Sequence, residues 1–204
     1  MKIAVLDLGI CNVGSVGCAI DSLGYPWELV RSTEEINLAS HLVLPGVGAF
    51  WEGAARLDAM GVRQAIVGHY VAGRPLLGIC LGMHLLADAG AEGGKADGLG
   101  IIHGGVDRLK GDGVRLPHIG WNEINLTGVH PILEGIQEGV DFYFAHTYRM
   151  RCRDVCSVVA ESDHGEQFPA IAASSNAVGV QFHPEKSQKN GLRVLENFCR
   201  WDGG

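Results

Sequence analysis

The stretch Pro75-Leu76-Leu77-Gly78-Ile79-Cys80-Leu81-Gly82 decides how this chain folds and where its chemistry lies. An apolar run long enough for a buried strand ends at Cys80, which has glycine two residues before it and two after it. Glycines in this pattern are typical of a nucleophile elbow, a strand-to-helix turn with little room for side chains. Such a turn exposes the thiol near backbone N–H groups and a helix N-terminus, which stabilise a thiolate. Taken alone, Cys80 is equally consistent with a buried cysteine in a glycine-rich core strand.

Size and charge narrow the class of protein. The chain has 204 residues, of which 47% are hydrophobic and 19% charged, so we expect a single domain spanning 1–204 with a full core. The formal net charge of -7 and the lack of a basic run disfavour nucleic-acid and anionic-membrane partners. No apolar stretch reaches the length of a membrane span, and Asp7 interrupts the first apolar run too early for a signal peptide. These features predict a cytoplasmic protein.

The cysteines predict neither a disulfide framework nor a metal site. Without a secretory signal, disulfides are improbable. Cys152 and Cys156 could form half of a metal site, but no second pair of ligands has a suitable spacing. We therefore expect no metal and no other cofactor.

The first half of the chain alternates between strand and helix patterns. Short apolar strands are expected at 2–6, 27–31, 42–44 and before Cys80, and helices at 13–23, 56–71 and after Cys80. The second half predicts strands separated by turns, at 101–109, 121–126, 140–147, 155–161, 170–174 and 177–182. A last helix is expected at 190–201. Residues 88–100 predict a surface loop. The pattern indicates an α/β fold, a three-layer sandwich whose central sheet is mainly parallel with an antiparallel portion.

A base and an orienting group for Cys80 are found near the C-terminus. His183 ends a predicted strand, and Glu185 lies two residues on, so both side chains fall on one side of an extended backbone. A carboxylate there can hold the imidazole in one tautomer and leave its other nitrogen for the thiol. By itself, a His-x-Glu pair is more often a surface feature than a catalytic one.

The segment Pro45-Gly46-Val47-Gly48-Ala49-Phe50 predicts a third part of a site. Glycines after a strand allow a backbone N–H to turn toward a reacting carbonyl, and the N–H of Leu81 could join it in an oxyanion hole. An ordinary strand-to-helix turn would have the same composition.

Together these segments resemble the class I (triad) glutamine amidotransferases. The likeness extends over nearly the whole chain, in the order that the family has, and is most specific to the amidotransferase subunits of imidazole glycerol phosphate synthase. It is carried by Gly9-x-x-Asn12, PGVGAF at 45–50, GICLGM at 78–83, LPHIGWNEI at 116–124, FYFAHTYR at 142–149 and GVQFHPEKS at 179–187.

The resemblance implies a glutaminase with a Cys-His-Glu triad. Cys80 would attack the side-chain amide of glutamine, His183 would protonate the departing ammonia, and Glu185 would orient His183. A glutamyl thioester would form and be hydrolysed to glutamate. Val47, Gly48 and Leu81 would supply the oxyanion region, and the substrate would be bound by His84, Glu92, Thr147 and Tyr148.

The resemblance also implies a partner, a (βα)8-barrel cyclase or synthase subunit in a heterodimer of the histidine-biosynthetic pathway. Asn12, Trp121, Tyr143 and Lys186 match positions that face it, and ammonia would pass to it without reaching bulk water. Trp121 and Tyr143 could instead be core aromatics, and Glu92 a solvated loop charge.

Three positions depart from the family pattern. His84 stands where the family usually has glutamine, which predicts weaker or pH-dependent substrate binding. Cys11 replaces a usual glycine, and Leu8 a frequent tyrosine. If Cys11 needs a positive φ, the first turn is strained or reshaped, and coupling to the partner changes with it.

Three other functions remain open on the sequence. A homologous subunit could serve a sugar-amidating synthase in surface-polysaccharide synthesis. A non-catalytic docking subunit would keep the fold, although the joint presence of Cys80, His183 and Glu185 argues against it. A cysteine peptidase of related fold is disfavoured by the PHIGWN and HPEKS segments.

Overall fold

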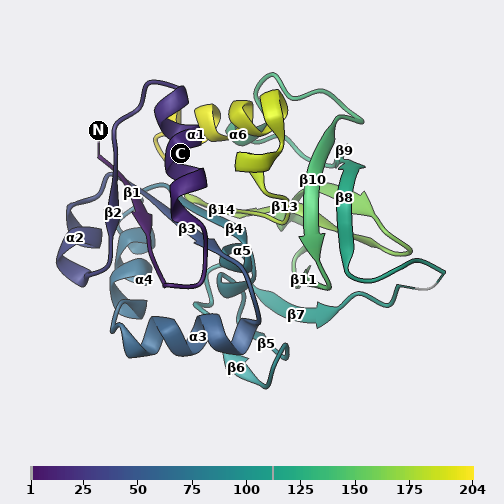
Figure 1. The fold of residues 1–204 in the computed structure, drawn as a ribbon, viewed down its shortest axis with the longest axis horizontal. Coiled ribbons are helices and arrows are strands. Elements are labelled where there is room, and N and C mark those ends of the chain that lie inside the picture. The colour runs from purple at the N-terminus through teal and green to yellow at the C-terminus, as the bar shows by residue number, and fades with distance from the viewer. Residues whose placement is uncertain (1, 112) are drawn as a thin grey trace.

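A central sheet runs through the molecule, with helices on both of its sides (Figure 1). The computed structural model describes residues 2–111 and 113–204. Eight strands form the sheet in the order β2-β1-β3-β4-β14-β13-β12-β9. Neighbours from β2 to β14 are parallel, and those from β14 to β9 are antiparallel. The predicted α/β class and mixed sheet are confirmed.

The strands of this sheet, in chain order, are β1 (Ile3–Leu6), β2 (Trp27–Val30), β3 (His41–Gly46), β4 (Leu76–Cys80), β9 (Asn125–Leu126), β12 (Val158–Asp163), β13 (Gln167–Ser174) and β14 (Ala177–Val180). The helices are α1 (Val13–Ser22), α2 (Thr33–Leu38), α3 (Phe50–Ala59), α4 (Arg63–Val71), α5 (Leu81–Leu85) and α6 (Gln188–Arg200). Single 3₁₀ turns lie at η1 (Pro131–Leu133), η2 (Val155–Ser157) and η3 (Pro184–Lys186).

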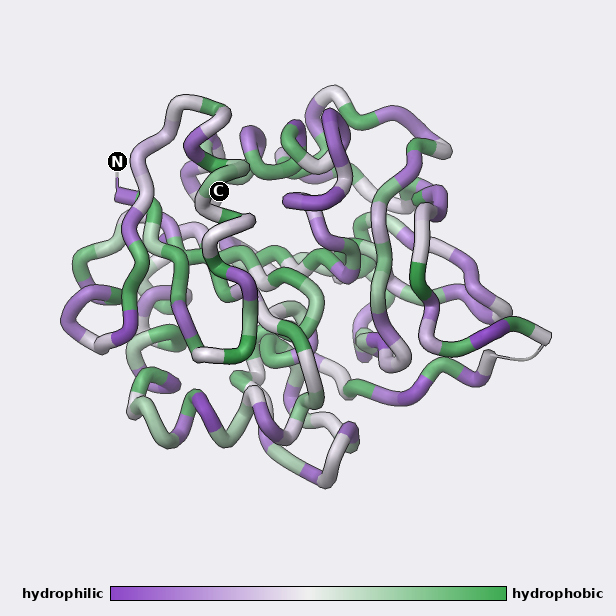
Figure 2. Tube along the Cα trace, viewed as in Figure 1, coloured by the Kyte–Doolittle hydropathy of each residue, from purple (hydrophilic) through white to green (hydrophobic). Residues whose placement is uncertain are grey.

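Side chains along each strand point alternately to the two faces of the sheet, and helices pack against both faces to give three layers. Ile3 and Val5 of β1 belong to a core shared with α1 and α6, whereas Ala4 and Leu6 belong to a second core shared with α2 to α5. Successive strand residues point to opposite faces, so a continuous apolar run serves both cores. Figure 1 accordingly shows α1 and α6 on one side of the sheet and α3 and α4 on the other. Figure 2 shows the apolar colour concentrated along the central strands.

Two smaller sheets complete the second half of the chain. One is the antiparallel pair of β8 (His118–Glu123) and β10 (Asp141–His146), which stands at the end of the molecule away from α2 (Figure 1). The other has the order β11-β7-β5-β6, formed by β5 (Ala89–Gly90), β6 (Ala96–Asp97), β7 (Gly104–Arg108) and β11 (Tyr148–Cys152).

The structure corrects several element predictions. The helix expected at 56–71 is two helices, because the chain turns at Gly61 with a φ of +66°, a conformation that ends α3. The loop expected at 88–100 contains β5 and β6, whose short pairing the composition did not indicate. Helix α2 was not predicted, although a capping box of Ser32 and Glu35 marks its start.

The elbow after β4 lies in close contact with the backbone of β3. A Cβ placed on Gly82 would lie 1.7 Å from the carbonyl oxygen of Leu44, and one on Gly78 would lie 2.7 Å from the backbone of Gly82. Neither obstacle is a flexible side-chain end, so the contact leaves no room for any other residue. These two glycines therefore set how closely α5 approaches the sheet.

Replacing Gly82 with alanine should destabilise the fold by about 3 kcal/mol or more, because the added methyl group displaces the β3 backbone. Urea denaturation monitored by circular dichroism measures the free energy of unfolding. Gly68→Ala in α4 is the matched control: no atom lies within 4 Å of a Cβ placed there, and a helical alanine should be neutral or stabilising by up to about 1 kcal/mol. Equal effects of the two substitutions would contradict this account.

Candidate active site

Cys80 occupies a strained position at the end of β4. Its φ of 53° and ψ of -109° lie outside the conformations that residues with side chains ordinarily adopt. Strain of this kind costs about 1–3 kcal/mol and persists only where the surroundings impose it. Pairing with β3 and β14 on either side and the glycine contacts of the elbow impose it here. The thiol sits at the N-terminus of α5 with 6% of the residue exposed.

His183 and Glu185 form a buried pair beside Cys80. Nδ1 of His183 lies 2.8 Å from Oε1 of Glu185, and only 5% and 6% of the two side chains are exposed. Burial opposes the charged imidazole, but hydrogen bonding to Cys80 and to Glu185 outweighs it and raises the pKa of His183 to about 10. The carboxylate engages Nδ1 and leaves Nε2 for the thiol, which is the arrangement that the spacing predicted.

Backbone contacts fix the histidine. The N–H of His183 donates to the carbonyl of Tyr143 at 2.9 Å, and the hydroxyl of Ser187 donates to the carbonyl of His183 at 2.7 Å. The same hydroxyl accepts the N–H of Tyr143 at 2.9 Å. Ser187, which the sequence did not single out, therefore ties the histidine to β10.

A pocket of about 300 Å³ opens at Cys80, a volume suited to a small ligand. Its wall includes all of the residues predicted to bind substrate or oxyanion, together with a few others. It is lined by Val47, Gly48, Ala49, Cys80, Leu81, His84, Glu92, Pro117, Ile119, Ala145, His146, Thr147 and Tyr148. His183 and Glu185 line a separate cavity of about 60 Å³ with Cys11, Asn12 and Lys186.

Glu92 is a half-buried wall residue and not a solvated loop charge. Burial raises the pKa of its carboxyl, partly offset by a hydrogen bond from the backbone N–H of Phe50. Its backbone carbonyl accepts the N–H of Trp51 at 3.1 Å, which holds the loop against α3. A carboxylate in this position can receive an ammonium group.

The oxyanion region is only partly assembled in this conformation. The N–H of Val47 donates to the carbonyl of Ile10 at 3.3 Å, so it is directed to the first loop and not to the pocket. Gly48 has a φ of +102°, which lets the backbone turn at this point, and Leu81 begins α5 with its N–H at the helix terminus. A role for Val47 as a donor therefore requires its bond to Ile10 to break.

The side chain of His84 is hydrogen-bonded to Gln181. Nε2 of His84 lies 2.6 Å from Oε1 of Gln181, and Nε2 of Gln181 lies 3.9 Å from Sγ of Cys80. Gln181 is fully buried, and His84 is 3% exposed. Burial lowers the pKa of His84 to about 4, against a smaller opposing effect of the bond to Gln181. The sequence interpretation treated Gln181 only as part of a motif and did not connect it to His84.

Three of the four residues expected to face a partner lie together. The Trp121 and Tyr143 rings meet edge to face with centroids 6.1 Å apart, and Nζ of Lys186 lies 5.7 Å from the Tyr143 ring centre. Trp121 is 47% exposed, which excludes the alternative of a core aromatic for that residue. Asn12 caps α1 by accepting the N–H of Ser15, and it shares the small cavity with Lys186.

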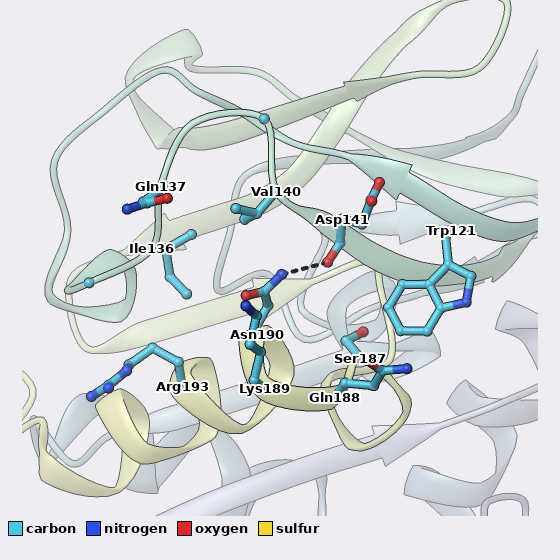
Figure 3. Close-up of a pocket in the computed structure, with 12 residues that line it drawn as sticks. Trp121, Ile136, Gln137, Val140, Asp141, Ser187, Gln188, Lys189, Asn190 and Arg193 are labelled. Atoms are coloured by element: carbon cyan, nitrogen blue, oxygen red, sulfur yellow. Dashed lines mark hydrogen bonds between the residues drawn. The ribbon is translucent and has the colours of Figure 1, made fainter.

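A larger hollow of about 730 Å³ lies beside this group, away from Cys80 (Figure 3). Figure 3 shows Trp121 at one end, Arg193 at the other, and Asn190 donating to the carbonyl of Asp141, at 3.1 Å. Cys80, His183 and Glu185 do not line it. Its polar wall is continuous with the surface that carries Trp121.

Two buried histidines, His118 and His146, are hydrogen-bonded to each other, and His146 lines the pocket. Nδ1 of His146 lies 2.8 Å from the carbonyl of Tyr148, so it donates, and Nε2 is then the acceptor for Nδ1 of His118 at 3.0 Å. Burial lowers the pKa of His118 to about 4 and that of His146 to about 3. Both histidines are therefore buried and neutral at pH 7.

The turn containing Cys11 is not strained at that residue. Among the described residues, positive φ values outside glycine occur at Cys80, Ser175 and Gln188, and Gly9 carries the positive φ of the first turn. The condition for a strained first turn, a positive φ at Cys11, is therefore not met. Burial, and next the charge of Asp7, raise the pKa of the Cys11 thiol to about 11. Leu8, at the position of a frequent tyrosine, is buried in the core with α2 to α5.

Within the described residues, no helix combines the length and apolar character that a membrane crossing requires.

Sequence comparisons cover the chain almost from end to end. The family model for "Glutamine amidotransferase class-I" matches residues 4–201. A protein of Aquifex aeolicus, "Imidazole glycerol phosphate synthase subunit HisH", is 43% identical over 201 residues, 98% of this chain and 97% of that protein. The protein of the same description from Moorella thermoacetica is 43% identical over 196 residues, 96% of this chain and 93% of its own length.

Solved structures agree in fold at lower identity. One described as a glutamine amidotransferase superposes with a TM-score of 0.78 at 20% identity and covers 99% of both chains. Another, described as a glutamine amidotransferase from Thermotoga maritima, gives a TM-score of 0.69 at 17% identity, with 98% of this chain and 82% of that chain covered. At these identities the likeness concerns the fold.

Replacing Cys80 with glycine should give a more stable protein than replacing it with alanine, by about 1 kcal/mol. Glycine adopts the observed positive φ without strain, and this gain exceeds its greater loss of backbone entropy on folding. Urea denaturation of the two variants makes the comparison, since both lack the thiol. An alanine variant that is equally or more stable would show that the position is unstrained.

The free energy of unfolding should fall as the pH is lowered from about 6.5 toward 4. His118 and His146 have folded pKa values below their ordinary value of 6.5, so in this range the unfolded chain binds protons that the folded chain does not. Each such proton changes the stability by up to about 1.4 kcal/mol per pH unit. Chemical denaturation across this range measures the slope, and a His118→Gln/His146→Gln variant should have a shallower one. An unchanged slope would contradict the assignment.

Proposed function

The chain belongs to the class I glutamine amidotransferase family, and from this we propose that it is the glutaminase subunit of an imidazole glycerol phosphate synthase, hydrolysing glutamine to glutamate for histidine biosynthesis. The observation that carries the proposal is the meeting of Cys80, His183 and Glu185 beside a pocket of about 300 Å³. Near-full-length identity of 43% to two proteins described as that subunit supports the choice of pathway. The cytoplasmic location expected from the sequence is part of the proposal.

In the first half of the reaction, the Cys80 thiolate attacks the side-chain amide carbon of glutamine. The resulting oxyanion accepts hydrogen bonds from the backbone N–H groups of Leu81 and Gly48, and of Val47 once its bond to Ile10 opens. Charged His183 gives its Nε2 proton to the amide nitrogen, which leaves as ammonia. The product on the enzyme is a glutamyl thioester, and His183 is then neutral.

In the second half, neutral His183 takes a proton from water, and the hydroxide formed attacks the thioester carbon. Collapse of this second tetrahedral species restores the thiolate and leaves the imidazole charged; the new carboxyl group of glutamate loses its proton to solvent. Glu185 keeps its hydrogen bond to Nδ1 throughout, which offsets the cost of a charged ring in a buried place. Glu92 receives the substrate's α-amino group, and the backbone of Thr147 and Tyr148 lines the same site.

The ammonia is used by a partner subunit, which we propose is a (βα)8 barrel. Exposed Trp121 and Lys186, with partly buried Tyr143 between them, make an aromatic and cationic group suited to such an interface. The cavity of about 60 Å³ joins Asn12 and Lys186 to the triad residues, so a partner bound there would lie next to the chemistry. The bond between Val47 and Ile10 lies in the same region, which gives partner binding a means to complete the oxyanion hole.

Glutamate release from glutamine should be slow for the chain alone and should rise on adding the histidine-pathway barrel subunit with its nucleotide ligand. Cys80→Ala should abolish glutamine hydrolysis while partner binding and synthesis from added ammonia continue, because the thiol is needed only to release ammonia. Glutamate release, co-elution with the partner and ammonia-dependent product formation are the three measurements.

Failure of stimulation together with labelling of Cys80 by a glutamine-analogue electrophile would favour a synthase of another pathway, such as the sugar-amidating one. No labelling, with the partner bound, would favour a non-catalytic docking subunit. Loss of ammonia-dependent synthesis in Cys80→Ala would assign the thiol a structural role.

A further inference from the structure

A hydrogen-bonded chain leads from α5 through the core to the nucleophile. His84 contacts Oε1 of Gln181 at 2.6 Å, and the amide nitrogen of Gln181 reaches Sγ of Cys80 at 3.9 Å. The residue that precedes Gln181 ends β14, and the N–H of Gln181 donates to the carbonyl of Ala170 at 2.9 Å, so its backbone is fixed by the sheet. Both side chains are almost completely removed from water.

The chemistry of the three groups allows only one direction of hydrogen-bond donation, from His84 to Gln181 and from Gln181 to Cys80. A thiolate has no proton to donate, so the group of Gln181 that faces it must be the NH₂. The amide oxygen then faces His84 and needs a donor, which is an N–H at Nε2 of a neutral imidazole. Burial without a carboxylate partner keeps that imidazole neutral at pH 7. The thiolate thus fixes the orientation of the Gln181 amide, and the amide oxygen fixes the N–H of His84 at Nε2.

The same logic excludes the opposite orientation while Cys80 is ionised. If the amide were reversed, its oxygen would face the sulfur and disfavour the thiolate, and its NH₂ would compete with the N–H of His84. An apolar residue at position 84 would leave the buried amide oxygen without a donor and free the amide to reverse. Leaving a buried polar group unpaired is costly, so the amide would not hold one orientation.

The other titratable groups near the thiol act from different elements. His183 lies just before η3 and Glu185 lies within it. His146 lies on β10, where nearby His84 lowers the pKa of His146 further, and Glu92 also lines the pocket. Of the histidines, only His183 has a pKa raised so that it is charged at neutral pH. Gln181 therefore supplies a donor that does not change with pH in the range where His84 stays neutral.

We infer that His84 and Gln181 are positioning residues, which hold an amide N–H on the sulfur of Cys80 and so favour its thiolate form. The inference rests on Cys80 being the nucleophile of the proposed function, and it assigns His84 to the support of the thiol instead of to direct binding of glutamine. Glutamine at position 84 could donate in the same way, because its amide also carries N–H groups.

The test is the pH dependence of Cys80 alkylation by iodoacetamide in the full chain, followed by mass spectrometry of the peptide that contains Cys80. This readout needs neither glutamine nor the partner, so it can fail independently of the proposed function. His84→Leu and Gln181→Met should each move the alkylation profile to higher pH by about one unit, roughly a tenfold slower reaction at pH 6. The double variant should move it no further than either single one.

His84→Gln should keep the wild-type alkylation profile, because the donor to Gln181 is restored. His69→Gln is the control for removing a buried histidine elsewhere: His69 is fully buried in α4 and bonds to the carbonyl of Pro75. It should leave the profile unchanged. If His84→Leu does not fold, Gln181→Met decides, since it nearly retains the size of the side chain and removes the N–H donor to Cys80 together with the oxygen that accepts from His84.

Unshifted profiles for both His84→Leu and Gln181→Met would overturn the inference. So would a His84→Gln variant as deficient as His84→Leu, since the imidazole itself would then be required. A rise in KM for glutamine in His84→Leu with an unchanged alkylation profile would return His84 to the substrate site and also reject the inference.

Discussion

The structure depends on the close approach of the turn after β4 to the backbone of β3. Gly82 lies against the carbonyl of Leu44 with no space for a side chain, and Gly78 lies similarly close to the turn itself. This contact draws α5 onto the sheet and forces Cys80 into a positive φ. A residue held in this way lowers stability, and pairing of β4 within a sheet that has seven other strands offsets this loss. Leu81 and His84, which line the pocket together with Cys80, take their positions from this turn.

Burial acts in opposite ways on the histidines around the thiol. His84, His118 and His146 have no carboxylate partner among the described residues, so burial keeps them neutral and gives each ring one donor and one acceptor. His183 is also buried, but Glu185 and the thiol beside it favour its charged form. The site therefore contains one imidazole able to give up a proton, surrounded by others that only define geometry.

Two structural features connect the surface expected to meet a partner with the site: a small cavity and a backbone hydrogen bond. One is the small cavity that joins Asn12 and Lys186 to His183 and Glu185. The other is the bond from Val47 to Ile10, which ties an oxyanion donor to the first loop. Both features reach the segment between β1 and α1, where Cys11 replaces the glycine usual in the family. Cys11 has no positive φ, so the exchange places no backbone strain on this residue.

The sequence by itself determined the α/β class, the elbow at Cys80 and the pairing of His183 with Glu185, because glycine spacing, apolar runs and a two-residue step act locally. The break at Gly61 and the start of α2 at Ser32 also had local signals, which a longer apolar period concealed. Only the tertiary structure decided what residue 84 contacts, since Gln181 lies 97 residues away and reaches it from the end of β14, the strand that pairs with β4. The same holds for His118 with His146 and for Val47 with Ile10: each depends on which segments the folded core brings together, and no periodicity encodes that.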